Sequence, residues 1–341
     1  MDLQRTLLIG AIALLSFMLL TEWVAFKEAK DTASAAESVR LIEDNGGSPD
    51  LPEMQQPDTS SEDLPSTPEE LEQETVTSTS TAPAVENPQG LVFVETDVLR
   101  IAIDLNGGDI IQLSLPKHLE TQDDPDSPFV LLEQNEQLVY IAQSGLIGPD
   151  GIDSDGRAVY TASAERFTLG AGEDALVIHL TWRDSADVKV TKRLTLRRGD
   201  YLVDVDYLVE NNSDQRWQGN LFGQIKRESA LPPSYNSTAM GMQPFLGVAT
   251  TQPDDRFTKF SFEDLAEEPF KAQLPGGWIA MIQHYFLSAW IPNQEQSHTF
   301  SARVTRSGFN IAGFTSPALA LDPAKSGEVG AGFYAGPKDQ Y

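Results

Sequence analysis

The chain contains no cysteine among its 341 residues. Disulfide frameworks, thiolate metal sites and cysteine nucleophiles are therefore excluded. This absence does not assign a cellular compartment, because a large β-sheet core can be stable in an oxidising space without disulfide bonds.

Basic residues are scarce as well. The chain has 24 Lys and Arg residues against 51 Asp and Glu residues, which gives a formal net charge of −27. This charge repels the phosphates of nucleic acid, and no basic stripe interleaved with aromatic residues offsets it. We therefore expect no nucleic-acid partner and no docking on anionic lipid through a basic patch.

The sequence also lacks the motifs of common enzymes and metal sites. Its histidines are His118, His179, His284 and His298. Their spacing matches neither HExxH nor another close metal-ligand pattern. No GxSxG elbow, P-loop or GxGxxG fingerprint is present. We expect no catalytic residue, no metal and no cofactor, and we expect His179 on the solvent side of a strand.

Two acidic patterns resemble functional sites. The stretch DGIDSDG (150–156) looks like a calcium loop, but in the EF-hand register its first and twelfth positions are Gly151 and Ala162, which supply no side-chain ligand. A polar surface turn is the better interpretation. Asp204 and Asp206 share one face of an expected strand, where acid–base chemistry is conceivable, but a solvated face is the simpler prediction.

The chain begins with an apolar run from Thr6 to Phe26. This run is long enough for a helix across roughly 30 Å of hydrocarbon. A cleaved signal peptide is the alternative, but its best cleavage motif, Ala33-Ser34-Ala35, lies well beyond the apolar core. We expect residues 1–27 to form an uncleaved anchor, with Arg5 favouring a cytoplasmic N-terminus.

An acidic region separates this run from the rest of the chain. Residues 31–90 contain fourteen Asp and Glu residues, Arg40 as the single basic residue, and no aromatic residue. Such a segment buries too little apolar surface to offset the entropy of ordering. Residues 28–90 are therefore predicted to be a disordered acidic linker, and an acidic interaction tail is the alternative.

Residues 91–341 carry nearly all the aromatic residues and alternate apolar with polar residues in short runs, as in VLRIAIDL (98–105). This alternation predicts antiparallel strands. The clearest window with helical periodicity is FEDLAEE (262–268). We therefore predict one large all-β sandwich over 91–341.

The stretch GGWIAMIQHYFLSAWIP (276–292) has no acidic residue, Lys or Arg. A second membrane span is one interpretation, but a span needs about 20 apolar residues, and Gln283-His284 would lie at its centre, where polar groups are costly. Glycines before the run and a proline at its end suit strand boundaries. We predict two core strands, or one long strand broken near Gln283-His284.

Several blocks of sequence, taken in order, resemble those of the YidC membrane insertases of Gram-negative bacteria. They are MDLQRTLL (1–8), TDVLRIAIDLNGGDI (96–110), QSGLIGPDG (143–151), KRLTLRRGDYLVDVDYLVEN (192–211), FGQIKR (222–227), GGWIAMIQHYFLSAWIP (276–292) and FYAGPKDQ (333–340). None is decisive alone, but their joint order is specific.

The resemblance implies an inner-membrane anchor followed by a large periplasmic domain with a β-supersandwich fold, similar to galactose-mutarotase-like domains. It implies an insertase and chaperone for inner-membrane proteins, working alone or with the Sec translocon and its accessory subunits. Partners would be nascent inner-membrane proteins, and the lipid bilayer through the N-terminal helix. No covalent chemistry is implied.

In the family, insertion is attributed to five further transmembrane helices after the counterpart of FYAGPKDQ, whereas this sequence ends at Tyr341. We therefore expect an N-terminal portion without the insertase core, serving as a periplasmic binding and positioning module. Lys226, Tyr235 and Met242 are the candidate partner contacts, on an expected exposed surface.

A second hypothesis is a carbohydrate-binding or aldose-epimerase-like domain, which follows from the implied fold alone. Mutarotation needs a general acid and a general base. His179 or His284, with a nearby carboxylate, would have to supply them. Because fold does not imply function, we favour the binding module.

Overall fold

The computed structural model describes residues 63–65, 90–120, 127–135, 138–184, 187–230, 244–252 and 256–338. The predicted anchor (1–27) and most of the predicted linker lie outside these residues. Among the residues described, no helix combines the length and the apolar character that a membrane crossing requires.

Ten strands form the first sheet, in the order β14-β17-β18-β11-β5-β4-β3-β2-β1-β7. Neighbouring strands are antiparallel, except that β1 and β7 are parallel. The strands are β1 (Leu91–Glu95), β2 (Arg100–Asp104), β3 (Asp109–Leu119), β4 (Pro128–Gln134), β5 (Val139–Ile147), β7 (Arg166–Thr168), β11 (Trp217–Glu228), β14 (Phe270–Pro275), β17 (Ser297–Val304) and β18 (Phe309–Leu321).

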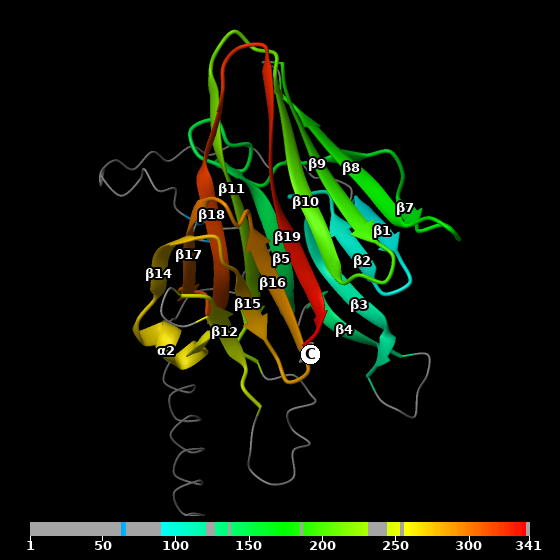
Figure 1. Cartoon of the computed structure of the whole chain (residues 1–341), viewed down its shortest axis with the longest axis vertical. Coiled ribbons are helices and arrows are strands. Elements are labelled where there is room, and N and C mark those ends of the chain that lie inside the picture. The colour runs from blue at the N-terminus through cyan, green and yellow to red at the C-terminus, as the bar shows by residue number, and fades with distance from the viewer. Residues whose placement is uncertain are drawn as a thin grey trace, which may run out of the picture. The chain divides into compact units, whose positions relative to one another are not determined.

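Nine strands form the second sheet, in the order β13-β12-β15-β16-β19-β10-β9-β8-β6. They are β6 (Thr161–Ala162), β8 (Ala175–Arg183), β9 (Val188–Arg197), β10 (Leu202–Asn211), β12 (Gly247–Thr250), β13 (Thr258–Ser261), β15 (Ile279–Ile282), β16 (Phe286–Pro292) and β19 (Lys325–Pro337). In Figure 1 this sheet lies toward the viewer and the ten-stranded sheet lies behind it. The predicted all-β sandwich is thus confirmed.

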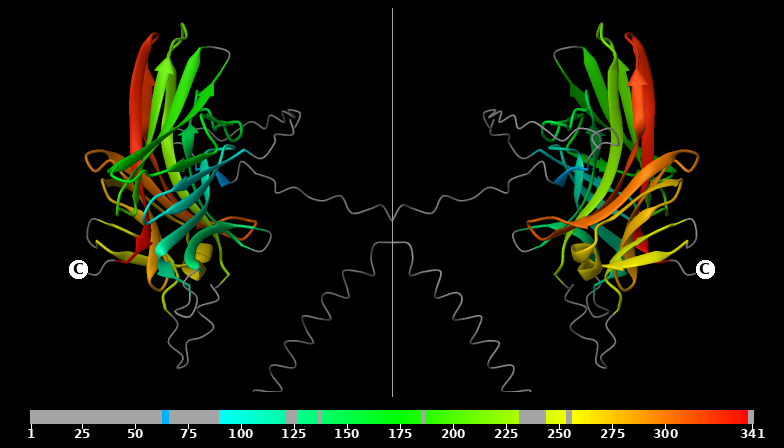
Figure 2. Two further views of the ribbon diagram at one scale, coloured as in Figure 1. Left: turned by 90° about the vertical axis from the view of Figure 1, so that its right-hand side faces the viewer. Right: turned by 90° about the vertical axis from the view of Figure 1, so that its left-hand side faces the viewer.

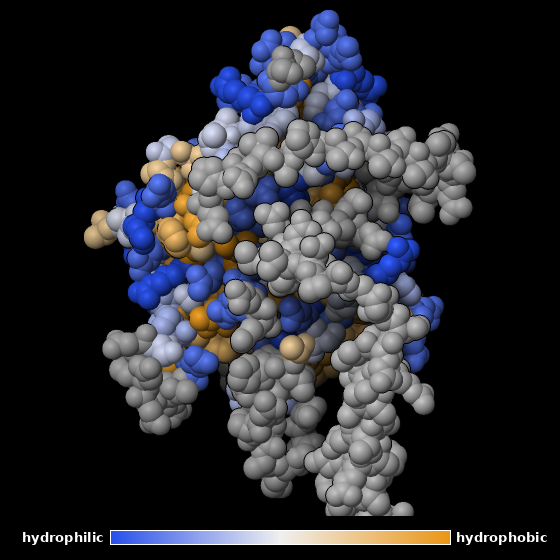
Figure 3. Space-filling model, turned by 180° about the vertical axis from the view of Figure 1, so that it is seen from behind, coloured by the Kyte–Doolittle hydropathy of each residue, from blue (hydrophilic) through white to orange (hydrophobic). Residues whose placement is uncertain are grey.

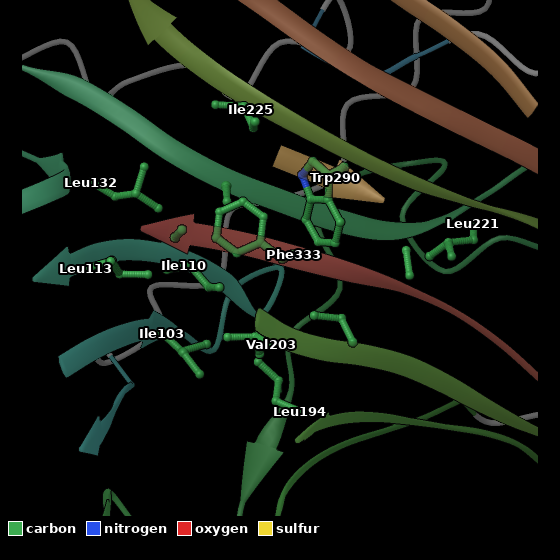
Figure 4. Close-up of a cluster of buried hydrophobic side chains, with 14 of the residues drawn as sticks. Ile103, Ile110, Leu113, Leu132, Leu194, Val203, Leu221, Ile225, Trp290 and Phe333 are labelled. Atoms are coloured by element: carbon green, nitrogen blue, oxygen red, sulfur yellow. The ribbon is translucent and has the colours of Figure 1, made fainter. Parts of the chain in front are cut away.

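The hydrophobic core fills the space between the two sheets (Figure 4). Ile225 of β11 reaches it from one sheet, while Trp290 of β16 and Phe333 of β19 reach it from the other. The rings of Trp290 and Phe333 are 4.9 Å apart, and the Trp290 Nε1 donates to the Gln224 carbonyl oxygen at 3.1 Å. This bond satisfies the polar atom of a large buried ring, so Trp290 joins the two sheets without an orphaned donor.

The run 276–292 forms the antiparallel hairpin of β15 and β16, in which Ile279 pairs with Trp290. All four residues of β15 are buried, because Ile279 and Met281 join the main core while Ala280 and Ile282 belong to a second apolar cluster. Gly276 and Gly277 have φ angles of 63° and 93°, a left-handed conformation that suits glycine. The prediction of two core strands is confirmed, including the break at Gln283-His284.

The helical window at 262–268 is also confirmed, as α2 (Phe262–Glu267). The Ser261 Oγ accepts a hydrogen bond from the Asp264 amide at 3.1 Å, and the Asp264 carboxylate accepts one from the Ser261 amide at 3.0 Å. This capping box satisfies amide groups that have no partner within the helix.

The outer face of the nine-stranded sheet carries charged pairs. On β10, Asp204 bonds Arg197 at 2.5 Å and Asp206 bonds Arg193 at 2.8 Å. His179 on β8 is exposed, as predicted. The solvated interpretation of Asp204 and Asp206 is confirmed, because both carboxylates lie on the half-exposed face of the strand.

Candidate functional site

Two neighbouring strands of the ten-stranded sheet, β5 and β11, are buried on both faces along most of their length. Gln143 of β5 lies opposite Gln224 of β11, and the Gln224 Nε2 donates to the Gln143 Oε1 at 3.0 Å. The Gln143 Nε2 in turn donates to the Asp109 Oδ2 at 2.8 Å. A buried polar chain therefore crosses the sheet surface at these strands.

Asp109 leads into a buried ion cluster. Arg157 forms an ion pair with Asp109, and its Nη1 donates to the Asp153 Oδ1 at 2.9 Å. The Arg157 Nη2 also donates to the Ser144 carbonyl oxygen at 3.0 Å. Asp153 is fully buried, and the amides of Leu146 and Ala158 donate to its carboxylate. These bonds pin the 150–156 turn against β5.

Burial and charge act in opposite directions on this cluster. Burial raises the pKa of Asp153, and the nearby Arg157 guanidinium partly opposes that rise. For Arg157, burial alone would lower the pKa, but the carboxylates of Asp109 and Asp153 raise it above its ordinary value. Removing one member of such a cluster is costly, because the remaining charges stay buried without compensation.

Lys192 of β9 approaches the same cluster from the other sheet. Its Nζ donates to the Gly108 carbonyl oxygen at 2.7 Å and lies 5.4 Å from the centre of the Tyr207 ring. Burial lowers the pKa of Lys192 to about 8. The two acids and two bases are all at least nine-tenths buried, so the cluster joins the sheets and offers no access to a substrate.

A short acidic segment lies against the outer side of the ten-stranded sheet. Figure 2 shows residues 63–65 in blue next to this sheet. Asp63 forms an ion pair with Lys226. The Gln224 Nε2 donates to the Asp63 carbonyl oxygen at 2.8 Å, and the Arg303 Nη2 donates to the Leu64 carbonyl oxygen at 3.4 Å. The polar chain from Asp109 therefore ends at Asp63.

A groove crosses the other end of this sheet, over β1 to β4. Its volume is about 490 Å³, and its lining includes Phe93, Val130 and Arg166. Phe93 and Val130 are each 37% exposed, and the Arg166 guanidinium lies 5.2 Å from the Phe93 ring centre. Figure 3 shows the apolar patch of this region on the left of the rear face. Such a surface suits contact with an apolar or aromatic group.

Comparison with known proteins identifies the family. The family model of the YidC periplasmic domain matches residues 91–341. The chain belongs to this family. The match begins at the first residue of β1, and it confirms the resemblance found in the sequence.

Several relatives of this YidC periplasmic domain are named "Membrane protein insertase YidC". The relative from Ectopseudomonas mendocina is 36% identical, over 100% of this chain and 61% of its own length. The relative from Cellvibrio japonicus is 37% identical, over 99% of this chain and 59% of its own length. The relative from Marinomonas sp. is 38% identical, over 100% and 59%. The chain thus spans about three-fifths of the length of these relatives.

Solved structures with a similar arrangement include a galactose mutarotase-like protein from Lactobacillus casei, with 10% identity and a TM-score of 0.48 over 72% of this chain and 100% of that one. A galactose mutarotase related enzyme from Lactobacillus acidophilus has 11% identity and a TM-score of 0.46 over 72% and 97%. At these values neither protein informs the function of the YidC periplasmic domain.

Of the three predicted contact residues of this YidC domain, the structure describes only Lys226. The side chain of Lys226 is only 13% exposed, because its ammonium group pairs with Asp63. Tyr235 and Met242 lie outside the described residues, so the structure does not bring the three together. Their role in partner contact stays a prediction.

The interpretation of DGIDSDG as a polar surface turn was incomplete. Asp150 and Asp155 are exposed, but Asp153 is fully buried. Its partner Arg157 follows four residues later. Nothing in the sequence around Asp153 distinguished this buried residue from its exposed neighbours. The sequence did carry a signal that Lys192 is buried. Along β9 it alternates with the same period as the buried residues Val190 and Leu194, so its side chain points to the same inner face.

Proposed function

We propose that this chain is the anchor and periplasmic portion of a membrane protein insertase, and that it binds and positions chains entering the inner membrane. The supporting observation is the similarity along the entire chain to proteins named membrane protein insertase, at 36–38% identity. The N-terminal apolar run belongs to the aligned length, so the proposal includes an anchor with a cytoplasmic N-terminus and a periplasmic β-domain.

The proposed partners are nascent inner-membrane proteins and the accessory subunits of the Sec translocon. The groove over β1 to β4 supports such a role, because it places exposed Phe93 and Val130 beside Arg166. Transient interfaces of this kind combine an apolar centre with a polar rim. Lys226, Tyr235 and Met242, which lie outside the segments that line this groove, remain proposed partner contacts.

We also propose that the domain is not an enzyme. The His118 Nε2 bonds the Tyr201 hydroxyl at 3.0 Å, and the His298 Nε2 bonds the Asn293 carbonyl oxygen at 2.7 Å. His284 stacks on Tyr285 with ring centres 3.8 Å apart. The partners of these three rings are therefore not the carboxylates that the aldose-epimerase hypothesis pairs with a histidine. A polarimetric assay of the full chain should detect no acceleration of aldose anomerisation.

Site-specific photo-crosslinking in cells tests the binding role. A crosslinking amino acid is placed at Val130 in the groove, at Tyr235 and at Met242, in the full chain. Val177 is the matched control, since it is 44% exposed on β8 of the opposite sheet. Capture of Sec subunits or nascent membrane proteins at the first three positions, and not at Val177, is expected. Equal capture at all positions, or none at the three, would overturn the proposal.

A further inference from the structure

The contact between Asp63 and the sheet has the geometry of a peptide in a binding site. Lys226 of β11 and Arg303 of β17 both pair in register with Ile311 of β18. Residues in one row across a sheet point to the same face, and strands lie about 4.8 Å apart. The two cations therefore flank one buried apolar residue on one face, roughly 10 Å from each other.

The site contacts both the side chain and the backbone of its occupant. Lys226 pairs with the Asp63 carboxylate, while Gln224 and Arg303 donate to the carbonyl oxygens of Asp63 and Leu64. Charge-assisted bonds select a carboxylate, whereas bonds to carbonyl groups accept any sequence. The minimum ligand is therefore a short peptide segment that contains one acidic residue.

Burial separates this contact from an ordinary surface ion pair. Asp63 is 8% exposed and Gln224 is 1% exposed, and the Lys226 ammonium also lies 4.2 Å from the centre of the Phe309 ring. The contact is thus shielded from water, which strengthens the attraction between the Asp63 carboxylate and the Lys226 ammonium group.

We propose that Gln224, Lys226 and Arg303 form a binding site for short acidic peptides, and that Asp63-Leu64-Pro65 occupies it as an intramolecular ligand. The proposal is independent of insertase function. Because only 25 residues separate Pro65 from Leu91 of β1, the effective concentration of the cis segment is on the order of millimolar. An acidic ligand in trans therefore competes poorly until the cis segment is released.

Zero-length crosslinking of the full chain tests the cis contact. A carbodiimide joins a carboxylate to an amine only when they touch, so the Asp63–Lys226 isopeptide should be found by mass spectrometry. Asp63→Asn should abolish this product. Glu72→Gln, which removes the same charge further along the acidic region, should leave it unchanged. Absence of the product in the wild-type chain would refute the cis contact.

Peptide binding tests the site itself. A fluorescent peptide, SSEDLPST (residues 60–67), is titrated by anisotropy against the full chain. We expect binding at least about ten-fold tighter to the Asp63→Asn chain than to the wild type, since the competing cis segment is weakened. The Asp63→Asn, Lys226→Gln double variant should lose that binding while keeping the wild-type near-ultraviolet circular dichroism spectrum. Equal binding to all three chains would overturn the proposal.

Discussion

The outer faces of the two sheets carry polar residues of different kinds. On the nine-stranded sheet, Asp204 pairs with Arg197, and both side chains are about one-third to one-half exposed. On the ten-stranded sheet, Gln143 and Gln224 bond each other and are almost fully buried. Solvent reaches the first face at β9 and β10, whereas the 150–156 turn and the Asp63 segment cover the second. Alternation along a strand therefore predicts which residues share a face, but not what covers that face.

The largest effect is expected from Arg157→Met on the covered face. This change leaves Asp109 and Asp153 as buried carboxylates without their shared cation. We expect a loss of about 3–5 kcal/mol in the free energy of unfolding, because breaking a buried ion cluster strands the remaining charges. Urea denaturation at pH 7 measures it. A loss below about 1 kcal/mol would mean that the cluster is not buried as described.

The second-largest effect is a pH dependence of the free energy of unfolding that Lys192 causes. Burial lowers its pKa to about 8 from an ordinary value of 10.5, so the unfolded chain binds more protons between these values. The Lys192 contribution to stability therefore rises with pH in this window and is lost as pH falls through about 8. We expect wild-type stability, relative to Lys192→Met, to increase by about 2 kcal/mol between pH 8 and pH 10.

Urea unfolding of both chains at pH 8, 9 and 10 checks this rise. Arg193→Met serves as a control on the same strand, since its side chain lies on the solvent side of the sheet. Parallel pH profiles for the wild type and the Lys192 variant would contradict a lowered pKa for this ammonium group.

A smaller effect is expected where the acidic segment meets the sheet. Asp63→Asn keeps the shape of the side chain but removes its charge opposite Lys226. We expect a loss of about 1 kcal/mol, between the values of exposed and buried ion pairs. Thermal denaturation measures it, with Glu72→Gln as the matched loss of charge. Identical melting temperatures for the two variants would argue that Asp63 contributes nothing to stability.

The smallest effect belongs to the water-covered face. Asp204→Asn breaks the pair with Arg197, but both groups stay hydrated. Exposed pairs contribute about 0.2–1 kcal/mol, so we expect a change below about 0.5 kcal/mol by urea denaturation. A loss as large as that of Arg157→Met would remove the distinction between the two faces.

The fold could be predicted from local patterns where neighbours in sequence are neighbours in space. The 276–292 hairpin and the helix after Ser261 are both of this kind. Their hydrophobic periodicity, glycines and capping residues all determine the structure of residues only a few positions away. The family resemblance supplied the rest of the architecture. The short segment at Asp63 could not be predicted, because its composition is that of a linker and its partners lie far along the chain.

The polar chain on the covered face was missed for a related reason. Gln143 meets Gln224 only because β5 pairs with β11 in one register, and a shift by one residue would send both amides to the other face. Asp153 is buried because Arg157 and two backbone amides bind it there. Strand register and loop packing depend on residues far apart in the sequence, so local composition does not predict them. The inward direction of Lys192 follows from local alternation along β9 and could be predicted.

The Asp63 contact also imposes an order on folding. Lys226 is made long after Asp63, and Arg303 later still, since their contacts span 163 and 239 residues of sequence. At synthesis rates of about 5–20 residues per second, the 163 residues that separate them place the synthesis of Asp63 about 8–33 seconds before that of Lys226. The contact cannot close until β11, β17 and β18 have come together, so closure of the acidic segment marks completion of the sheet.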